Sequence, residues 1–356
     1  MTSIGILSVG TYIPPTVRTN EFWSRATVDE WTERMAARVT RGDALPTDIS
    51  DGARLTIEAM TAYAKDPFRG ARKRHTLGDM SIHEAETRAA REAIQRAGLR
   101  PDEIDVILTE TMVPEQLLVN CAAVVHKALE LPARCMAIMT SVACNGFAMH
   151  ATMAKALIAS GQARNVLSVV GCGTTRVVDS AEPDSAWWGD GAAAVVFGPV
   201  SEGRGILSAI HHTDGTASNA LVIGIPGKHW WDQGQNTLHS ADRSHTRTML
   251  MGLADRARDA IHASISAAGL QPTDIDFYAS HQGTVWLADV TKKHAGLDRA
   301  QTLSTFSAFG HLGSVNIPLI LSIAEKEGML RDGMLLTTFT GGVGETWSSM
   351  CFRWGR

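Results

Sequence analysis

Residues 94–108 read IQRAGLRPDEIDVIL, and residues 265–279 read ISAAGLQPTDIDFYA. Both segments share the pattern AGL-x-P-x-[DE]-ID followed by an apolar run. In each copy this pattern predicts a helix that ends at a glycine (Gly98, Gly269), a turn with proline, and a short buried strand. Self-similarity of this kind indicates an internal duplication.

A second pair of segments matches in the same order. ALIASGQARNVLSVVGCG (156–173) and SIAEKEGMLRDGMLLTTFTGG (322–342) both read as helix, glycine, basic turn, β-rich run and glycine. Two matches in one order favour duplication over chance. The predicted fold is therefore α/β, with two similar halves, 1–200 and 201–356, each with a largely buried sheet between helices.

Composition excludes several classes of protein. Hydrophobic residues make up 44% and charged residues 20% of the 356 positions, as in an ordinary globular protein. A net charge of −4 gives no sign of nucleic-acid binding, and no apolar run has the length of a membrane helix. The N-terminus lacks the pattern of a signal peptide. We therefore expect a cytoplasmic protein that binds neither nucleic acid nor membrane.

The cysteines are odd in number and have no CxxC spacing, which argues against a disulfide framework and against a metal site. They are Cys121, Cys135, Cys144, Cys172 and Cys351. In a reducing compartment a free thiol stays available for chemistry. Four of the five are interpreted as small buried hydrophobic residues.

Cys144 is the exception, because it lies among small residues in SVACNGF (141–147), directly before a helix-like run. A thiol at a helix N-terminus gains from the helix dipole and from free backbone N–H groups, so we expect its pKa to be lowered. The same N–H groups can stabilise the oxyanion that forms when a thioester carbonyl is attacked. Cys144 is thus the candidate nucleophile.

Two histidines are candidate partners of this thiol. His281 follows the apolar run IDFYAS, and His311 lies between glycines in FGHLGS. Both fall where a strand gives way to a helix, as Cys144 does, and ligands of α/β folds bind beyond the carboxyl ends of strands. One cleft is expected to gather all three. His150, inside the helix that follows Cys144, is interpreted as structural.

Five segments carry a family resemblance: SVACNGF, WWGDGAAAVVFG (187–198), SHQGT (280–284), FGHLGSVNIPL (309–319) and GGVGETWSSMCFRW (341–354). Together, and in this order, they resemble the ketoacyl-ACP synthase III group of the thiolase fold. The resemblance implies a homodimer with an α-β-α-β-α layered arrangement. It also implies that Cys144 accepts an acyl group from a CoA or acyl-carrier-protein thioester, with His281 beside it and no tightly bound cofactor.

The chain departs from the family pattern at the site. The family's HQAN is HQGT here, and the family's catalytic asparagine is replaced by His311, with Asn316 five residues further on as a possible substitute. The resemblance assigns His and Asn together to the enolate that forms when a malonyl group loses carbon dioxide. The departure favours the branch of synthase-like acyltransferases that esterify sugars or natural-product scaffolds, with an imidazole as base.

The resemblance also assigns binding residues. Trp31 would stack on the adenine of CoA, and a basic cluster would meet its phosphates or an acidic carrier protein; the alternative for the cluster is a solvated turn. The cluster residues named as ligands are Arg69, Arg72 and Arg74. Leu118 and Val119 match the region that reaches the partner's acyl pocket, and Gly342 would bring backbone close to the thiol, to complete an oxyanion site with Cys144.

Two further features have open interpretations. Residues 32–66 form an insertion with two helix-like stretches around a Pro-Asp turn; it is either a lid or wall of an enlarged acceptor site or a solvated decoration. Trp230 and Trp231 lie in a loop rich in glycine and proline, where they either hold an acceptor or pack.

Three functions follow from these patterns. The leading hypothesis is transfer of an acyl group, through Cys144 and without decarboxylation, to a hydroxyl or amine of a natural-product or sugar acceptor. The second is a condensing enzyme that forms a carbon–carbon bond. The third is an inactive synthase-like subunit that supports a partner, against which the retention of both Cys144 and His281 argues.

Overall fold

In the computed structural model, which describes residues 2–40 and 48–356, each copy of the repeated sequence forms the elements that it predicts. Helices α3 (Ile82–Ala97) and α6 (Arg243–Ala267) both end beside a glycine in the left-handed conformation, with φ of 71° at Gly98 and 70° at Gly269. Short 3₁₀ turns follow, η2 (Pro101–Glu103) and η7 (Pro272–Asp274). The buried strands β4 (Val106–Met112) and β11 (Phe277–Ser280) come next.

The strands form two five-stranded sheets with the same topology. The first has the order β1-β7-β6-β4-β5 and the second has the order β8-β14-β13-β11-β12, so the two correspond strand for strand. In each sheet the three strands at one end run parallel and the other pairings are antiparallel. The remaining strands are β1 (Ile4–Tyr12), β7 (Gly191–Pro199), β6 (Val166–Cys172), β5 (Met136–Met139), β8 (Gly205–Thr213), β14 (Thr346–Arg353), β13 (Leu335–Gly342) and β12 (Gln301–Thr302).

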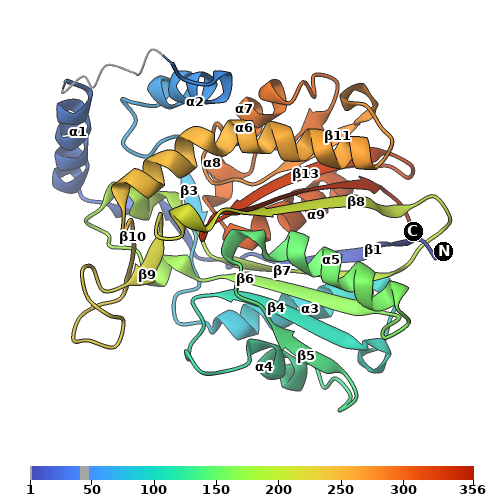
Figure 1. The fold of residues 1–356 in the computed structure, drawn as a ribbon. Helices are drawn as coiled ribbons and strands as arrows, with labels where there is room; N and C mark the ends of the chain where they lie inside the picture. The colour runs from blue at the N-terminus through green and yellow to red at the C-terminus, as the bar shows by residue number, and fades with distance from the viewer. Residues whose placement is uncertain (1, 41–47) are drawn as a thin grey trace.

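Helices and sheets alternate in five layers (Figure 1). Helices α3 and α4 (Cys121–Ala128) cover the outer face of the first sheet, and α6 and α7 (Leu287–His294) cover that of the second. Between the sheets lie α5 (Gly146–Ala159) and α9 (Asn316–Lys326). This arrangement is the predicted duplicated thiolase fold. The predicted division at residues 200 and 201 falls between β7 and β8.

The two halves share one hydrophobic core around α5 and α9. Phe147 of α5 and Ile320 of α9 pack in a cluster that includes Phe197 of the first sheet and Phe277 of the second. Burial of apolar surface on both faces of these two helices explains why their sequences lack a strong polar stripe. The N-termini of α5 and α9 therefore meet at the centre of the molecule, where η3 (Ala143–Asn145) contacts η8 (Gly313–Val315).

The insertion forms helical structure at one end of the molecule (Figure 1). Helix α1 (Arg25–Thr40) precedes it and runs into it, and α2 (Asp51–Ala62) packs on α6 and α7. Most of the predicted Pro-Asp turn lies outside the described residues. Smaller elements are β2 (Val17–Thr19), β3 (Lys73–His75), β9 (Val222–Gly224), β10 (Thr237–His239) and α8 (Phe306–Phe309). Among the described helices, none combines the length and apolarity that crossing a bilayer requires.

Candidate active site

The nucleophile loop, residues 140–144, is held in a strained shape by the second half of the chain. Ala143 has φ of 49°, a left-handed conformation that costs a residue with a Cβ about 1–3 kcal/mol. Ser314 holds the loop from η8, since its hydroxyl donates to Ala143 O and accepts from Gly146 N at 2.9 Å. Thr340 of β13 donates to Cys144 O at 2.9 Å. The loop is therefore positioned by contacts between the halves.

Sequence reasoning missed Ser314, although the repeat carries the signal. Ser314 is the middle residue of η8, as Cys144 is the middle residue of η3, so the two occupy equivalent places in the duplicated halves.

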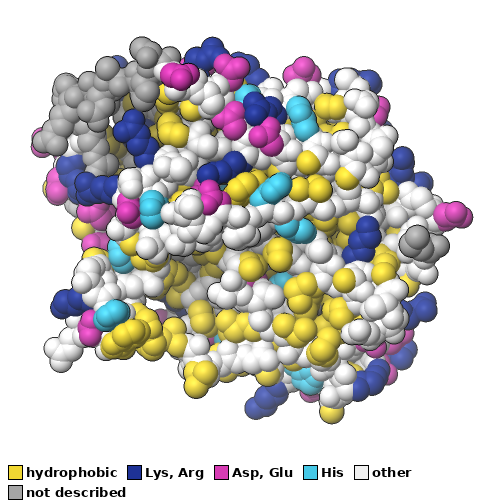
Figure 2. Space-filling view, in the orientation of Figure 1, with side chains coloured by type: hydrophobic (Ala, Val, Ile, Leu, Met, Phe, Trp, Pro, Cys, Tyr) yellow, Lys and Arg dark blue, Asp and Glu magenta, His cyan; other side chains and the backbone are white. Residues whose placement is uncertain are grey.

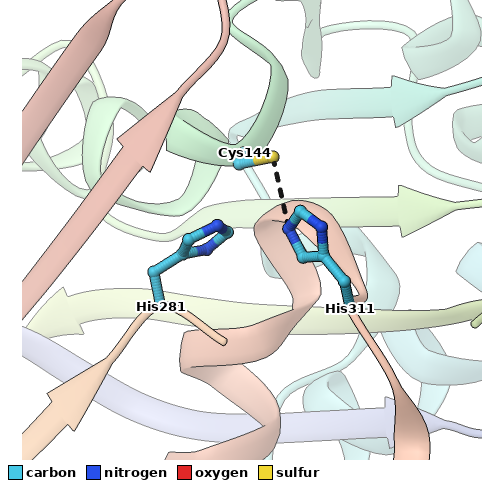
Figure 3. A group of neighbouring side chains, drawn as sticks. All are labelled: Cys144, His281 and His311. Carbon is cyan, nitrogen blue, oxygen red and sulfur yellow. Dashed lines mark hydrogen bonds between the residues drawn. The ribbon is translucent and has the colours of Figure 1, made fainter. Parts of the chain in front are cut away.

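Cys144, His281 and His311 lie together, as the sequence predicted. One ligand atom from each residue falls within 4.8 Å of the others, and His311 Nε2 is 3.7 Å from Cys144 Sγ. The two imidazole rings meet edge to face with centroids 4.7 Å apart. Figure 3 shows the dashed contact from the sulfur to His311 and the two histidines reaching it from different loops.

His311 is set in place by close backbone contacts. Its N–H donates to Trp187 O at 2.6 Å, its ring packs at a tilt of 33° on Trp188 with centroids 4.0 Å apart, and the preceding Gly310 has φ of 72°. A Cβ on Gly310 would lie 2.7 Å from Trp187 O, so only glycine allows this approach.

Asn316 contacts and orients His281, and its role as a substitute for the family's catalytic asparagine stays a prediction. Asn316 Oδ1 accepts from Leu312 N at 3.2 Å, so the Nδ2 group faces His281 Nδ1 at 3.4 Å. A nitrogen that accepts a hydrogen bond carries no proton, so His281 has its proton on Nε2. His281 therefore offers an N–H donor to the site.

Burial keeps both histidines neutral. It lowers the pKa of His281 to about 4. Burial, with a smaller contribution from His281, holds the pKa of His311 well below its ordinary value. Neutral imidazoles at physiological pH are hydrogen-bond donors and acceptors and carry no charge into the site.

The prediction of a lowered pKa for Cys144 is wrong for the structure as it stands. Burial raises the pKa of this thiol, and the nearby Cys172 and Glu110 raise it further. The favourable backbone contribution at the start of the helix is smaller than the cost of desolvating a thiolate. The thiol is therefore neutral at rest, and it must lose its proton to a base as it attacks; His311 Nε2 is the ring nitrogen that it contacts.

His150 and Gly342 lie where the sequence analysis expects them. His150 is fully buried beside Thr140 and Ser168, and burial lowers its pKa to about 3, which fits a structural role. A Cβ on Gly342 would lie 3.0 Å from Val142 O and 3.2 Å from Asn145 N, so its backbone does pass beside the nucleophile loop.

Two residues assigned to CoA are buried, which corrects that assignment for this conformation. Trp31 is fully buried against Trp23 and Phe68, and its Nε1 donates to Ala181 O at 2.7 Å. Arg74 is also fully buried; it donates to backbone carbonyls and to a neighbouring side chain. Burial, with a smaller contribution from a nearby guanidinium, lowers its pKa to about 10. Both side chains join the N-terminal segments to the core.

The other assigned residues are more accessible. Arg72 is exposed, and Arg69 is half-buried and donates to Met60 O and Tyr63 O at 3.4 Å. Leu118 is fully exposed and Val119 is partly exposed, on the loop between β4 and α4. Their ligand and acyl-pocket roles stay predictions.

Trp230 and Trp231 do not pack into the core, so that interpretation of the pair is wrong. They are 52% and 64% exposed on the loop between β9 and β10, and Trp231 stacks on His229 with centroids 4.3 Å apart. Figure 2 shows hydrophobic side chains gathered at this end of the molecule, at the lower left. A role in holding an acceptor stays a prediction.

Part of the insertion lines a pocket. Helix α2 forms one wall of a pocket of about 720 Å³, and helix α6 forms the opposite wall. Ile57 and Met60 line it from α2, Arg247 and Met251 line it from α6, and Arg69 also borders it. Its lining does not include Cys144, His281 or His311, so the role of the insertion as a lid or wall of an acceptor site stays a prediction.

Two family models match the chain. Residues 140–215 match 3-Oxoacyl-[acyl-carrier-protein (ACP)] synthase III, and residues 265–354 match 3-Oxoacyl-[acyl-carrier-protein (ACP)] synthase III C terminal. The first match contains the nucleophile loop and the second contains both histidines. Each half of the site is thus within a matched segment.

The chain is similar along its length to known proteins. It is 30% identical over 358 residues to the beta-ketoacyl-[acyl-carrier-protein] synthase III of Symbiobacterium thermophilum, covering 99% of this chain and 98% of that one. It is 30% identical over 310 residues to the protein of the same name from Cereibacter sphaeroides, covering 84% and 93%. The crystal structure of 3-oxoacyl-[acyl-carrier-protein] synthase III from Aquifex aeolicus superposes with a TM-score of 0.80 at 23% identity, covering 99% and 100%.

Proposed function

Since the chain belongs to the beta-ketoacyl-[acyl-carrier-protein] synthase III family, we propose that it is an acyltransferase that loads an acyl group onto Cys144 and joins it to a carbanion. The acyl donor would be a CoA or carrier-protein thioester. The carbanion would come from decarboxylation of a second, malonyl-type thioester. The observation that carries this proposal is the grouping of Cys144 with two neutral imidazoles.

The first half-reaction needs a base at the thiol. His311 Nε2, in the tautomer with its proton on Nδ1, accepts the Cys144 proton as the sulfur attacks the thioester carbonyl. The tetrahedral oxyanion would lie against the backbone N–H groups of Cys144 and Gly342. When it collapses, the carbon–sulfur bond of the donor breaks, and the departing thiolate takes the proton from His311.

The second half-reaction needs hydrogen-bond donors more than a base. Loss of carbon dioxide from a malonyl thioester leaves an enolate, and an N–H group aimed at its oxygen lowers the barrier. His281 Nε2–H is held as such a donor by Asn316. His311 would be a second donor in its Nε2–H tautomer. The enolate carbon then attacks the acyl-Cys144 carbonyl, and the thiolate of Cys144 leaves.

The hydrogen bonds of His281 favour this reaction over transfer to an alcohol. Its Nδ1 accepts from Asn316 and its Nε2 carries the proton, so neutral His281 has no free ring nitrogen with which to take the proton of a hydroxyl group. The same neutral imidazole is a good hydrogen-bond donor. The site thus suits decarboxylative condensation, the second of the three hypotheses.

Transfer without decarboxylation to a hydroxyl or amine of a natural-product or sugar acceptor is the second candidate. One observation favours it: His311, where the family resemblance places asparagine, contacts the thiol directly and can move protons, which an amide cannot do. We further propose that the protein acts as a homodimer in either reaction.

Intact-protein mass spectrometry tests the proposal. The enzyme is mixed with a panel of acyl-CoA thioesters, alongside Cys144→Ala, and a malonyl thioester is then added to the loaded enzyme. A mass gain of one acyl group that is absent from the variant, followed by release of carbon dioxide and a chain-extended product, supports condensation. A malonyl group that stays on the enzyme with its carboxylate supports the second candidate. No adduct with CoA or carrier-protein donors supports an inactive subunit.

A further inference from the structure

Glu110 is a buried carboxylate directly behind the nucleophile loop. It lies on β4 with 3% of its surface exposed. Its Oε2 accepts from Val142 N at 2.9 Å and from Thr140 Oγ1 at 2.8 Å. These two donors belong to the segment that leads into Cys144, so the carboxylate fixes the backbone just before the nucleophile.

Packing places Glu110 against the first turn of α5 as well. A Cβ on Gly146 would lie 2.6 Å from Glu110 Cγ and 2.7 Å from Glu110 Cβ. Contacts below 3.0 Å cannot form without a shift of the neighbour, so the carboxylate side chain and the glycine fit as a pair. Glu110 thus touches the loop on both sides of Cys144.

The chain of hydrogen bonds that ends at Glu110 has one consistent assignment of donors and acceptors. When the Thr140 hydroxyl donates to Glu110, it accepts from His150 Nε2–H at 2.9 Å, and His150 Nδ1 then accepts from Ser168 at 2.9 Å. Burial keeps His150 neutral, which allows this arrangement. The network therefore runs from Ser168 to Glu110 and ends on an acceptor.

Among the described residues, no lysine or arginine forms an ion pair with Glu110. The titratable groups that face it are Glu86 from α3, Cys144 from η3 and, through Thr140, His150 from α5. Burial, opposed by the hydrogen bonds from Val142 N and Thr140 and aided by Glu86, raises the pKa of Glu110 to about 7. The nearby carboxylate in turn raises the pKa of Cys144, after burial and Cys172.

We propose that Glu110 is a positioning residue for the nucleophile. Its carboxylate holds residues 140–143 in the strained shape that presents Cys144 to both histidines, and its negative charge opposes ionisation of the thiol. Cys144 is therefore less reactive when Glu110 is deprotonated than when Glu110 is neutral. This role does not depend on which acceptor the enzyme uses.

Alkylation of Cys144 by iodoacetamide, followed by peptide mass spectrometry from pH 6 to 9, tests the charge effect without any substrate. Glu110→Gln keeps the shape and an acceptor oxygen but removes the charge. We expect the variant and the wild type to react at similar rates at pH 6, where Glu110 is largely neutral in the wild type. Above pH 8 the variant should react at least about threefold faster, since half a pKa unit changes the thiolate population by about that factor.

Glu92→Gln is the matched control, because Glu92 also accepts a backbone hydrogen bond, from Thr11 N at 2.7 Å, but its charge is paired with Arg96 and Lys326. Its rate relative to the wild type should not change across this pH range. A rate ratio for Glu110→Gln that is constant with pH would overturn the charge effect, whatever the enzyme's substrate.

Glu110→Ala separates positioning from charge. It removes the acceptor, so Cys144 should be alkylated at least about tenfold more slowly than in Glu110→Gln at pH 9, and the glutamine variant rescues the rate. Equal rates in the two variants would overturn the positioning role. If Glu110→Ala does not fold, the rate comparison is made with Thr140→Val, which removes one of the two loop hydrogen bonds and should be slower than wild type at every pH.

Discussion

Buried histidine at the active site predicts a specific dependence of stability on pH. In the native protein, burial lowers the pKa of His281 to about 4, whereas an unfolded chain has a histidine pKa of about 6.5. Below pH 6.5 the unfolded state binds a proton that the native state does not. The stability that neutral His281 contributes is therefore fully present above pH 6.5 and is lost as the pH falls towards 4.

The size of the effect follows from the shift. A difference of about 2.5 pKa units corresponds to about 3 kcal/mol, at about 1.4 kcal/mol per unit. His281→Asn removes this titration. We expect the wild type to lose about 3 kcal/mol more than the variant between pH 7 and pH 4, even if the variant is less stable at pH 7.

Equilibrium unfolding in urea at pH 7, 6, 5 and 4 measures this difference. The quantity compared is the difference in free energy of unfolding between the two proteins, and how this difference changes with pH. Glu110 and other buried carboxyl groups with raised pKa values stabilise both proteins as the pH falls, so their contribution cancels in the difference. Ser218→Ala, at an exposed position without a titrating group, is the control, and its difference in free energy of unfolding from the wild type should not vary with pH. A difference between wild type and His281→Asn that changes by less than about 1 kcal/mol would refute the reasoning.

Three further predictions concern the nucleophile and its surroundings. His311→Ala should slow acylation of Cys144 about 100-fold or more in single-turnover mass spectrometry, because the thiol loses its base; a loss below twofold would show that His311 is structural. Gly146→Ala should lower the free energy of unfolding by about 1–3 kcal/mol in urea because its Cβ would overlap Glu110, whereas Gly215→Ala, which has open space, should change it little. Treatment with a chelator should leave acylation of Cys144 unchanged, although a thiol with two imidazoles is also a zinc donor set; a loss that zinc restores would show a metal centre.

The repeated sequence determined the fold because its signals are local. A helix that ends at Gly98 or Gly269, a turn that starts with proline and an apolar strand each depend on a few neighbouring residues. Two copies in one order then require two similar sheets. The order of elements also placed Cys144, His281 and His311 at strand-to-helix junctions, and the carboxyl ends of strands converge in such folds.

The protonation states of the site residues could not be predicted from the sequence. A helix N-terminus suggested a lowered pKa for Cys144, but the cost of burying a thiolate exceeds that gain. Burial arises from the packing of α5 and α9 between the two sheets, which no local pattern encodes. The tautomer of His281 likewise depends on Asn316, which lies 35 residues further along the chain and reaches it through the packing of α9 against β11.

Burial also decided which of the predicted ligand residues are accessible. Trp31 and Arg74 read as surface ligands, yet contacts from the chain near Ala181 and Ala186 enclose them, while Trp230 stays exposed. The sequence by itself thus determined the duplicated architecture and the identity of the reactive groups, because periodicity and capping act over short stretches. Which of those groups are charged, oriented or accessible was decided only by tertiary structure, because desolvation and hydrogen-bond direction depend on atoms far away in the chain.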